Sequence, residues 1–215
     1  MSSNMIRLRQ GFALMILVIS GCAPQVDVEV DAADVDEFDY LKFDGNSLLS
    51  THDIKLAMRM PSEYKLIKPI SYQAVFNEIR FNVSVAGFVK GKTLLFVSAE
   101  KLTDNGGHLD YSHFEPTELN GIKFYKRSRC AELTPDDIEA AADLRYLKEN
   151  GYDFHPTIYL THFFQNSADG NFEYVVVFGE QVSSCSENII TDAFKVRFNN
   201  KLKQTIDLTK IDKTN

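Results

Sequence analysis

The chain contains no tryptophan, only three cysteines and no excess of basic residues among its 215 positions. Its 23 Lys and Arg are outnumbered by 30 Asp and Glu, which leaves a formal net charge of −7. Because a nucleic-acid-binding protein needs a basic face to neutralise phosphates, this charge balance argues against a nucleic-acid partner. The chain also lacks internal repeats and a Gly-x-Ser-x-Gly motif, so nothing local to the sequence indicates a repeat protein or an α/β-hydrolase.

The overall composition is that of an ordinary globular protein, with 44% apolar and 25% charged residues. Sixteen Phe and nine Tyr provide most of the bulk for one hydrophobic core, and the length suits a single domain. The acidity is unevenly spread, because residues 26–44 hold eight acids and one base. The remaining chain from Gly45 onward is nearly neutral.

The amino-terminal segment has the pattern of a secretory signal. Arg7 and Arg9 precede an unbroken apolar run at residues 12–19. As a helix this run would span about 12 Å, against about 30 Å of membrane hydrocarbon, so it is too short for a transmembrane anchor. Ser, Gly and Cys follow the run directly, so that residues 19–22 read Ile-Ser-Gly-Cys and the cysteine is Cys22. This pattern resembles the lipobox of bacterial lipoproteins, although an ordinary signal peptide with an incidental cysteine is the alternative.

The resemblance implies that residues 1–21 are a signal peptide and that Cys22 is acylated and becomes the first residue of the mature chain. The residue after Cys22 is Ala23, where an Asp would favour the inner membrane. The resemblance therefore implies that the protein is located at the periplasmic face of the outer membrane. The membrane is thus the first predicted partner, reached through two or three acyl chains. Residues 22–45 then form an acidic tether, which the repulsion between like charges holds extended.

The other two cysteines, Cys130 and Cys185, are expected to pair. In the oxidising compartment that a signal peptide implies, two cysteines most simply form one disulfide. Two buried free thiols, or a metal pair with additional ligands, are the alternatives.

The clearest helix signal begins at Thr134, a good N-cap residue followed by Pro135. Apolar residues then recur at every third position as far as Leu144 and Leu147, and Asn150-Gly151 ends the pattern. Near the carboxyl end, apolar residues recur every four positions from Ile190 to Ile206, which favours a helix over the competing strand pattern.

Alternating or continuous apolar residues predict strands at residues 54–60, 76–89, 93–99, 122–129, 157–165 and 172–182. This order of elements predicts an α+β fold for residues 46–207, as a single domain. The fold would be a mostly antiparallel β-sheet with two main helices packed on it. Residues 208–215 are expected to be a polar tail.

Two segments of the domain resemble a known family. The first is Met-Pro-Ser-Glu-Tyr at residues 60–64, which ends the opening strand, and the second is the strand, loop and helix of residues 174–206. Both are similar to parts of the photosystem II extrinsic P subunit and its bacterial relatives. The resemblance implies an α/β/α sandwich and a non-catalytic accessory or binding role.

A loop rich in metal-ligand types lies at residues 108–115, where His108, Asp110 and His113 could coordinate zinc. Their spacing fits no common zinc motif, and the same residue types are typical of a surface loop. We therefore predict no cofactor. A metal-dependent envelope hydrolase built on these three residues is the alternative to a binding protein.

A strand that starts at Ile122 directs its basic residues to one side. By the period of two, Lys123, Arg127 and Arg129 share a face, while Ile122 and Phe124 point to the core. This face is expected to be exposed and to attract an acidic envelope protein, an anionic polymer or the acidic tether itself. The predicted function is that of a lipid-anchored envelope protein of binding or accessory type.

Overall fold

A computed structural model describes residues 39–76, 78–107 and 109–211. The larger sheet consists of β4 (Lys65–Phe76), β5 (Ile79–Lys90), β6 (Thr93–Leu102), β7 (Glu115–Leu119), β8 (Ile122–Glu132), β9 (Thr157–Asn166) and β10 (Phe172–Gln181). The smaller sheet consists of β1 (Leu41–Asp44), β2 (Ser47–Ser50), β3 (Leu56–Arg59) and β11 (Asp207–Lys210). The helices are α1 (Pro135–Ala140), α2 (Ala142–Glu149) and α3 (Asp192–Thr205).

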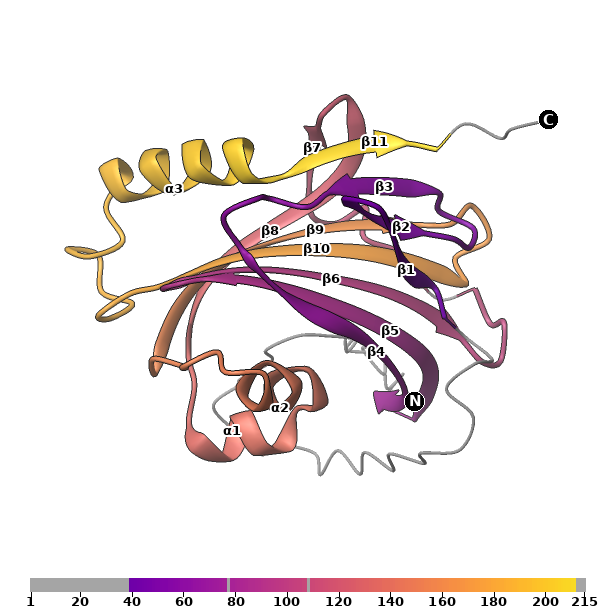
Figure 1. Ribbon diagram of the computed structural model, residues 1–215, viewed down its shortest axis with the longest axis horizontal. Coiled ribbons are helices and arrows are strands. Elements are labelled where there is room, and N and C mark those ends of the chain that lie inside the picture. The colour runs from indigo at the N-terminus through magenta and orange to yellow at the C-terminus, as the bar shows by residue number, and fades with distance from the viewer. Residues whose placement is uncertain (1–38, 77, 108, 212–215) are drawn as a thin grey trace, which may run out of the picture.

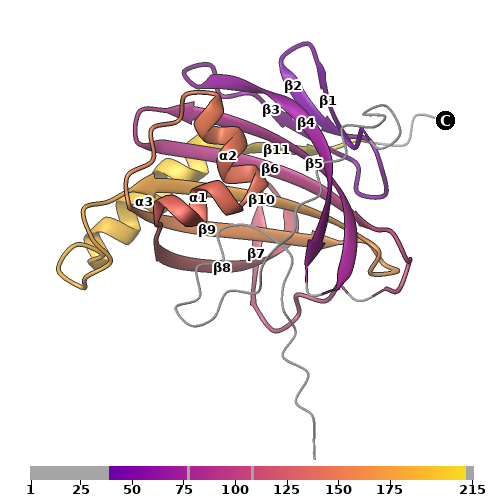
Figure 2. The same ribbon diagram turned by 90° about the horizontal axis from the view of Figure 1, so that it is seen from below.

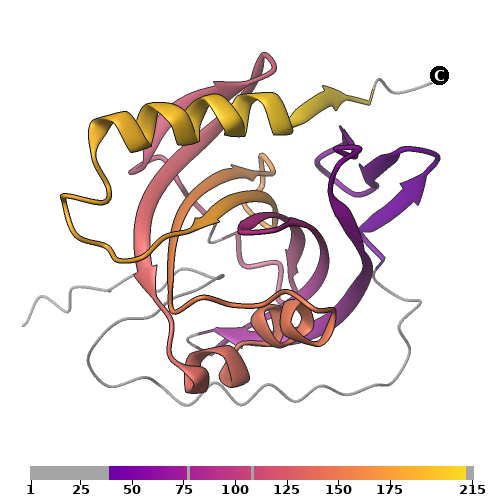
Figure 3. The same ribbon diagram turned by 60° about the vertical axis from the view of Figure 1, so that its left-hand side comes forward.

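The two sheets and the helices form one sandwich-like domain, which confirms the predicted α+β class. The seven-stranded sheet has the order β4-β5-β6-β10-β9-β8-β7, and neighbouring strands are antiparallel. The sheet is strongly curved (Figure 3). Helix α3 and the smaller sheet cover its convex face, and α1 and α2 lie on its concave face (Figures 1 and 2).

The central strands are buried on both faces, because each face of the larger sheet has its own apolar core. On β10, Val175 and Val177 point to the concave side, where they belong to the same cluster as Leu147 of α2. Val176 and Phe178 alternate with them and join the cluster of Phe198 from α3. This explains the nearly continuous apolar run in this strand.

The predicted helix at residues 134–150 is present but is interrupted. Thr134 accepts a hydrogen bond from the Asp137 amide, and Asp137 bonds back to the Thr134 amide, so a capping box starts α1. The backbone then becomes extended at Ala141, and α2 starts afresh. The break lets α2 turn independently, and its Leu144 and Leu147 are almost fully buried in the concave core.

The second predicted helix is α3, which begins after the N-cap Thr191 and buries Phe198 and Leu202. None of the helices in the described parts of the chain is long and apolar enough to cross a membrane.

The folded part reaches further at both ends than the expected boundaries. Strand β1 lies inside the segment assigned to the tether, because Leu41 is buried and pairs with Ser50 of β2. Strand β11 lies inside the segment assigned to the polar tail, where Leu208 is buried against the smaller sheet. The signal peptide, Cys22 and residues 22–38 of the tether lie outside the described residues.

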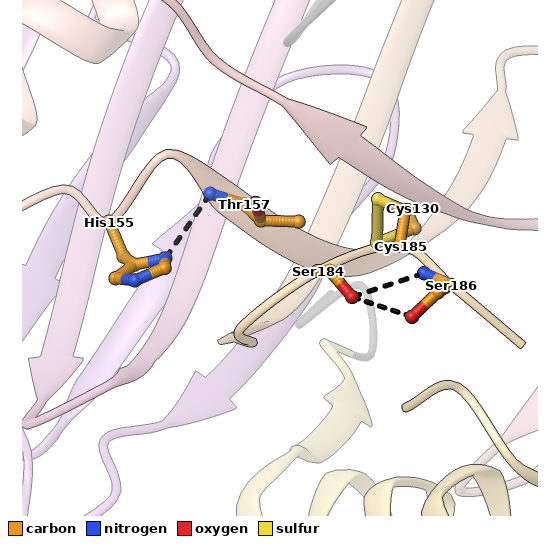
Figure 4. Close-up of a disulfide and its surroundings, with 6 residues drawn as sticks. All are labelled: Cys130, His155, Thr157, Ser184, Cys185 and Ser186. Carbon is orange, nitrogen blue, oxygen red and sulfur yellow. Dashed lines mark hydrogen bonds between the residues drawn. A yellow bond between two sulfur atoms is a disulfide. The ribbon is translucent and has the colours of Figure 1, made fainter. Parts of the chain in front are cut away.

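The sulfur atoms of Cys130 and Cys185 lie at bonding distance, as the predicted disulfide requires, and their Cα atoms are 5.5 Å apart (Figure 4). The bond joins β8 to the loop between β10 and α3. It therefore links the larger sheet to the segment that leads into α3 on the convex face.

Candidate functional site

The basic face of β8 points to the concave side of the sheet. Ile122 and Phe124 are buried on the opposite, convex side, as predicted. Lys123 and Arg127 are exposed, but the expectation of a fully exposed face is wrong for Arg129, which is half-buried beside Leu160 of β9. Burial, together with the charge of Arg127, lowers the pKa of the Arg129 guanidinium to about 10. The Arg129 side chain is therefore still cationic at neutral pH.

Aromatic rings adjoin this basic face. The guanidinium of Arg127 lies 5.5 Å from the centroid of the Phe114 ring, a distance at which a cation and an aromatic face attract each other. Phe114 stacks on Phe164 of β9 with centroids 5.4 Å apart, and Tyr111 stacks on the same Phe164 ring at 4.5 Å. The basic residues thus border an aromatic stack that extends into the concave core.

An open groove of about 660 Å³ lies along β7, β8 and β9, next to the basic face. Its lining comprises Pro116, Thr117, Glu118, Lys123, Phe124, Tyr125, Phe164, Gln165 and Asn166. The Oε1 atom of Gln165 is buried, and within the described parts of the chain no donor reaches it. The Gln165 side chain lies on the convex face with Tyr174, its partner in register. The groove itself therefore offers a cation and aromatic surface.

A pair of buried carboxyl groups lies deeper on the concave face, where sequence reasoning placed no site. Glu100 of β6 and Glu173 of β10 are directly opposite in register, and both side chains are 0% exposed. The Tyr111 hydroxyl donates to Glu173, and the Ser98 hydroxyl donates to Glu100 at 2.7 Å. Two carboxyl groups so close in an apolar environment cannot both ionise without a large penalty.

Burial is the main cause of the unusual acidity of this pair. Desolvation raises the pKa of Glu173 to about 7, although the hydrogen bond from Tyr111 opposes that rise. Desolvation and then the neighbouring Glu173 charge hold the pKa of Glu100 well above its ordinary value. The pair therefore carries at least one proton through the acidic range, and it loses its last proton only above neutral pH.

The predicted metal loop is only partly described, because His108 lies outside the described residues. Both oxygens of the Asp110 carboxylate accept from Ser112, and His113 packs against the Phe114 ring at 4.0 Å. Among the described residues, no group of three or more His, Cys, Asp or Glu side chains could hold a metal ion. The contacts of Asp110 and His113 are thus those of a structured surface turn.

Comparison with known proteins gives no family assignment: no family model, no curated protein and no solved structure matches the chain. The candidate site therefore rests on the chemistry of this chain alone. It consists of the β8 basic face, the adjoining groove and the aromatic stack that leads to the buried acid pair.

A local signal could have revealed the acid pair. On the predicted strand at residues 172–182, Glu173 shares the period-of-two face of Val175 and Val177, which are plainly core residues. A Glu on such a face must be paired, hydrogen-bonded or protonated. Its pairing with Glu100, however, depends on the register between two strands that lie about 70 positions apart in sequence.

Proposed function

We propose that this protein is a lipid-anchored binding or accessory protein of the bacterial cell envelope. Its ligand is an anionic polymer of the envelope, held in the groove beside β8. The observation that carries the ligand site is the position of Lys123 in the lining of a polar and aromatic groove, with Arg127 above Phe114 at its side. The proposed anchoring rests on the amino-terminal sequence, with Cys22 as the acylated residue.

The composition of the groove favours a polymer of charged units over an apolar ligand. Aromatic faces can stack on flat units, and Lys123 can neutralise an acidic group. Cations at an exposed rim steer an anionic partner and respond to salt more than they tighten the complex. Salt dependence is therefore an expected property of the interaction.

Charge reversal in the groove tests the ligand site. We expect Lys123→Glu with Arg127→Glu to lower capture by immobilised dextran sulfate about tenfold and to weaken its salt dependence. Arg129 is left unchanged because it is half-buried and its reversal would disturb folding. The matched control is Lys55→Glu with Lys203→Glu, which changes the net charge equally at two exposed positions outside the groove.

The control variant should bind the polymer as the original protein does. Equal losses in both variants would mean that the polymer responds only to total charge, and unchanged capture would refute the site. Preference for polyglutamate over dextran sulfate would instead identify an acidic protein as the partner.

Membrane fractionation tests the anchor. Because stable anchoring requires two or more acyl chains on one residue, Cys22→Ser should move the protein from the membrane fraction to the soluble fraction. Cys130→Ser should leave the chain membrane-bound. A Cys22→Ser protein that still sediments with membranes would contradict lipid anchoring.

A further inference from the structure

Residues 109–114, here called the Tyr111 strap, cross the concave face between β6 and β7. The amide of Leu109 donates to the Gly170 carbonyl at 3.1 Å, and the Asn166 side-chain amide donates to the Leu109 carbonyl at 3.1 Å. The strap inserts Tyr111, which is 0% exposed, between the Phe164 ring and the carboxyl group of Glu173. It therefore seals the acid pair on the side that faces the groove.

We propose that the Tyr111 strap is a proton-controlled latch: it is closed while Glu100 and Glu173 share a proton, and it opens when both side chains ionise. The effect of the latch on ligand capture rests on the function proposed above. The latch itself rests on two fully buried carboxyl groups in register and on the tyrosine that covers them.

Within the described parts of the chain, the groups that act on the pair are hydrogen-bond donors and a further acid. Ser98 on β6 and Tyr111 on the strap are hydrogen-bond donors, not cations. The remaining neighbours come from the other packed elements: Tyr72 of β4, Val83 of β5, Asn166 of β9, and Asp143 with Arg145 of α2. Asp143 adds a further acid, and Arg145 acts on Asp143 and Tyr72. Water is thus the remaining means of stabilising a doubly ionised pair.

The strap is the element whose opening would admit that water. The two acids belong to β6 and β10, which are central strands of the larger sheet. Each of these strands is hydrogen-bonded to a neighbouring strand on both sides. Among the described residues, the strap is held by hydrogen bonds at Leu109 and Tyr111 and by ring contacts, without a ladder of strand pairing. A segment of this kind opens at a lower free-energy cost than a central strand. Ionisation therefore favours the open strap and leaves the sheet intact.

The sign of the pH dependence follows from the acidity of the pair. Burial raises the pKa of Glu173 from 4.5 to about 7, so the closed strap retains a proton that the open strap would release. The pair still shares one proton after Glu173 ionises, because the Glu173 charge further raises the pKa of Glu100. The contribution to the closed form is therefore lost only as the pH rises above about 7, where the second proton leaves.

Opening of the strap changes the groove, because the Pro116 and Thr117 wall follows directly after Phe114 and Glu115. An open strap withdraws the Phe114 ring from Arg127 and leaves two carboxylates behind the groove. Capture of an anionic polymer should therefore weaken above neutral pH.

Hydrogen exchange of the full chain, corrected for intrinsic exchange rates, tests the latch. Protection of the Leu109 and Phe114 amides should fall as the pH rises above about 7, while protection in β10 stays constant. In the Glu100→Gln protein only Glu173 can ionise, so the pair cannot carry two charges and most of that fall should be lost. Glu118 is an exposed acid outside the pair, so the control Glu118→Gln should show the same fall in protection as the original protein.

Protection that does not depend on pH, or a fall that persists in Glu100→Gln, would overturn the latch. If Glu100→Gln does not fold, Glu173→Gln provides the same test from the other strand. The latch and the proposed function fail separately. A strap that opens with pH in a protein that never captures dextran sulfate refutes only the function, whereas pH-independent protection with charge-dependent capture refutes only the latch.

Discussion

Tyr111 connects the groove to the buried acids through one ring and one hydroxyl group. Its ring stacks on Phe164, and its hydroxyl donates to Glu173. Burial and the neighbouring Glu173 charge hold the pKa of Tyr111 well above its ordinary value, so the phenol remains a donor throughout the physiological range. The side chain therefore has a constant hydrogen-bonding role beside a pair that titrates.

Removing that hydroxyl should destabilise the protein more while the strap is closed than once it is open. In the closed strap, the hydrogen bond to the carboxyl group contributes about 1 kcal/mol. We expect Tyr111→Phe to lower the free energy of unfolding by about 1 kcal/mol at about pH 5.5, and by less at about pH 8.5, where the open strap no longer makes the bond. Urea denaturation at both pH values measures this loss of stability. Tyr125→Phe is the control, and equal losses at both values would argue against a titrating partner.

At single positions, the sequence predicts which side of a strand a residue occupies better than how deeply it is buried. The period of two correctly separates Lys123 and Arg127 from Ile122 and Phe124. It does not indicate that Arg129 is half-buried, because that depends on the curvature of the sheet and on the neighbouring β9. Contacts between residues distant in sequence, such as Glu100 with Glu173, require the strand register.

Among the elements, the caps and turns were the most predictable parts. Thr134 starts α1, and Asn150 ends α2, because their side chains and backbones satisfy helix termini locally. No local pattern predicts the extended backbone at Ala141 that divides α1 from α2, because neither Gly nor Pro stands there. Strand β4 was missed because Pro69 and two lysines interrupt its alternation, as is usual for an edge strand with a bulge.

The disulfide joins two elements that no long run of backbone hydrogen bonds connects. Closing a loop of 55 residues should stabilise the fold by about 4 kcal/mol in the chain-entropy model. Urea denaturation with and without a reductant should show a loss of this size. A Cys130→Ala, Cys185→Ala protein should be equally destabilised and should not respond to the reductant. Stability unchanged by reduction would mean that the bond adds nothing to this fold.

For the whole molecule, composition and element order were sufficient for the α+β class but not for the strand order. Strand β10 lies between β6 and β9, so the chain inserts its last long strand into the middle of the sheet. Pairing of this kind brings distant segments together, and a reading of neighbouring residues does not contain it. The lipid anchor and the resemblance to the photosystem II P subunit remain predictions.

The bond between Cys130 and Cys185 also makes residues 130–185 a covalent ring that contains α1, α2, β9 and β10. A protease that cuts the exposed turn after Asn166 would open this ring without dividing the protein. With Cys22 acylated, the carboxyl-terminal fragment, including β10 and α3, would stay attached to the membrane through the amino-terminal fragment. The covalent link would be lost only if the cut were combined with reduction of the disulfide, so an acylated chain would stay attached to the membrane after one cut within the ring.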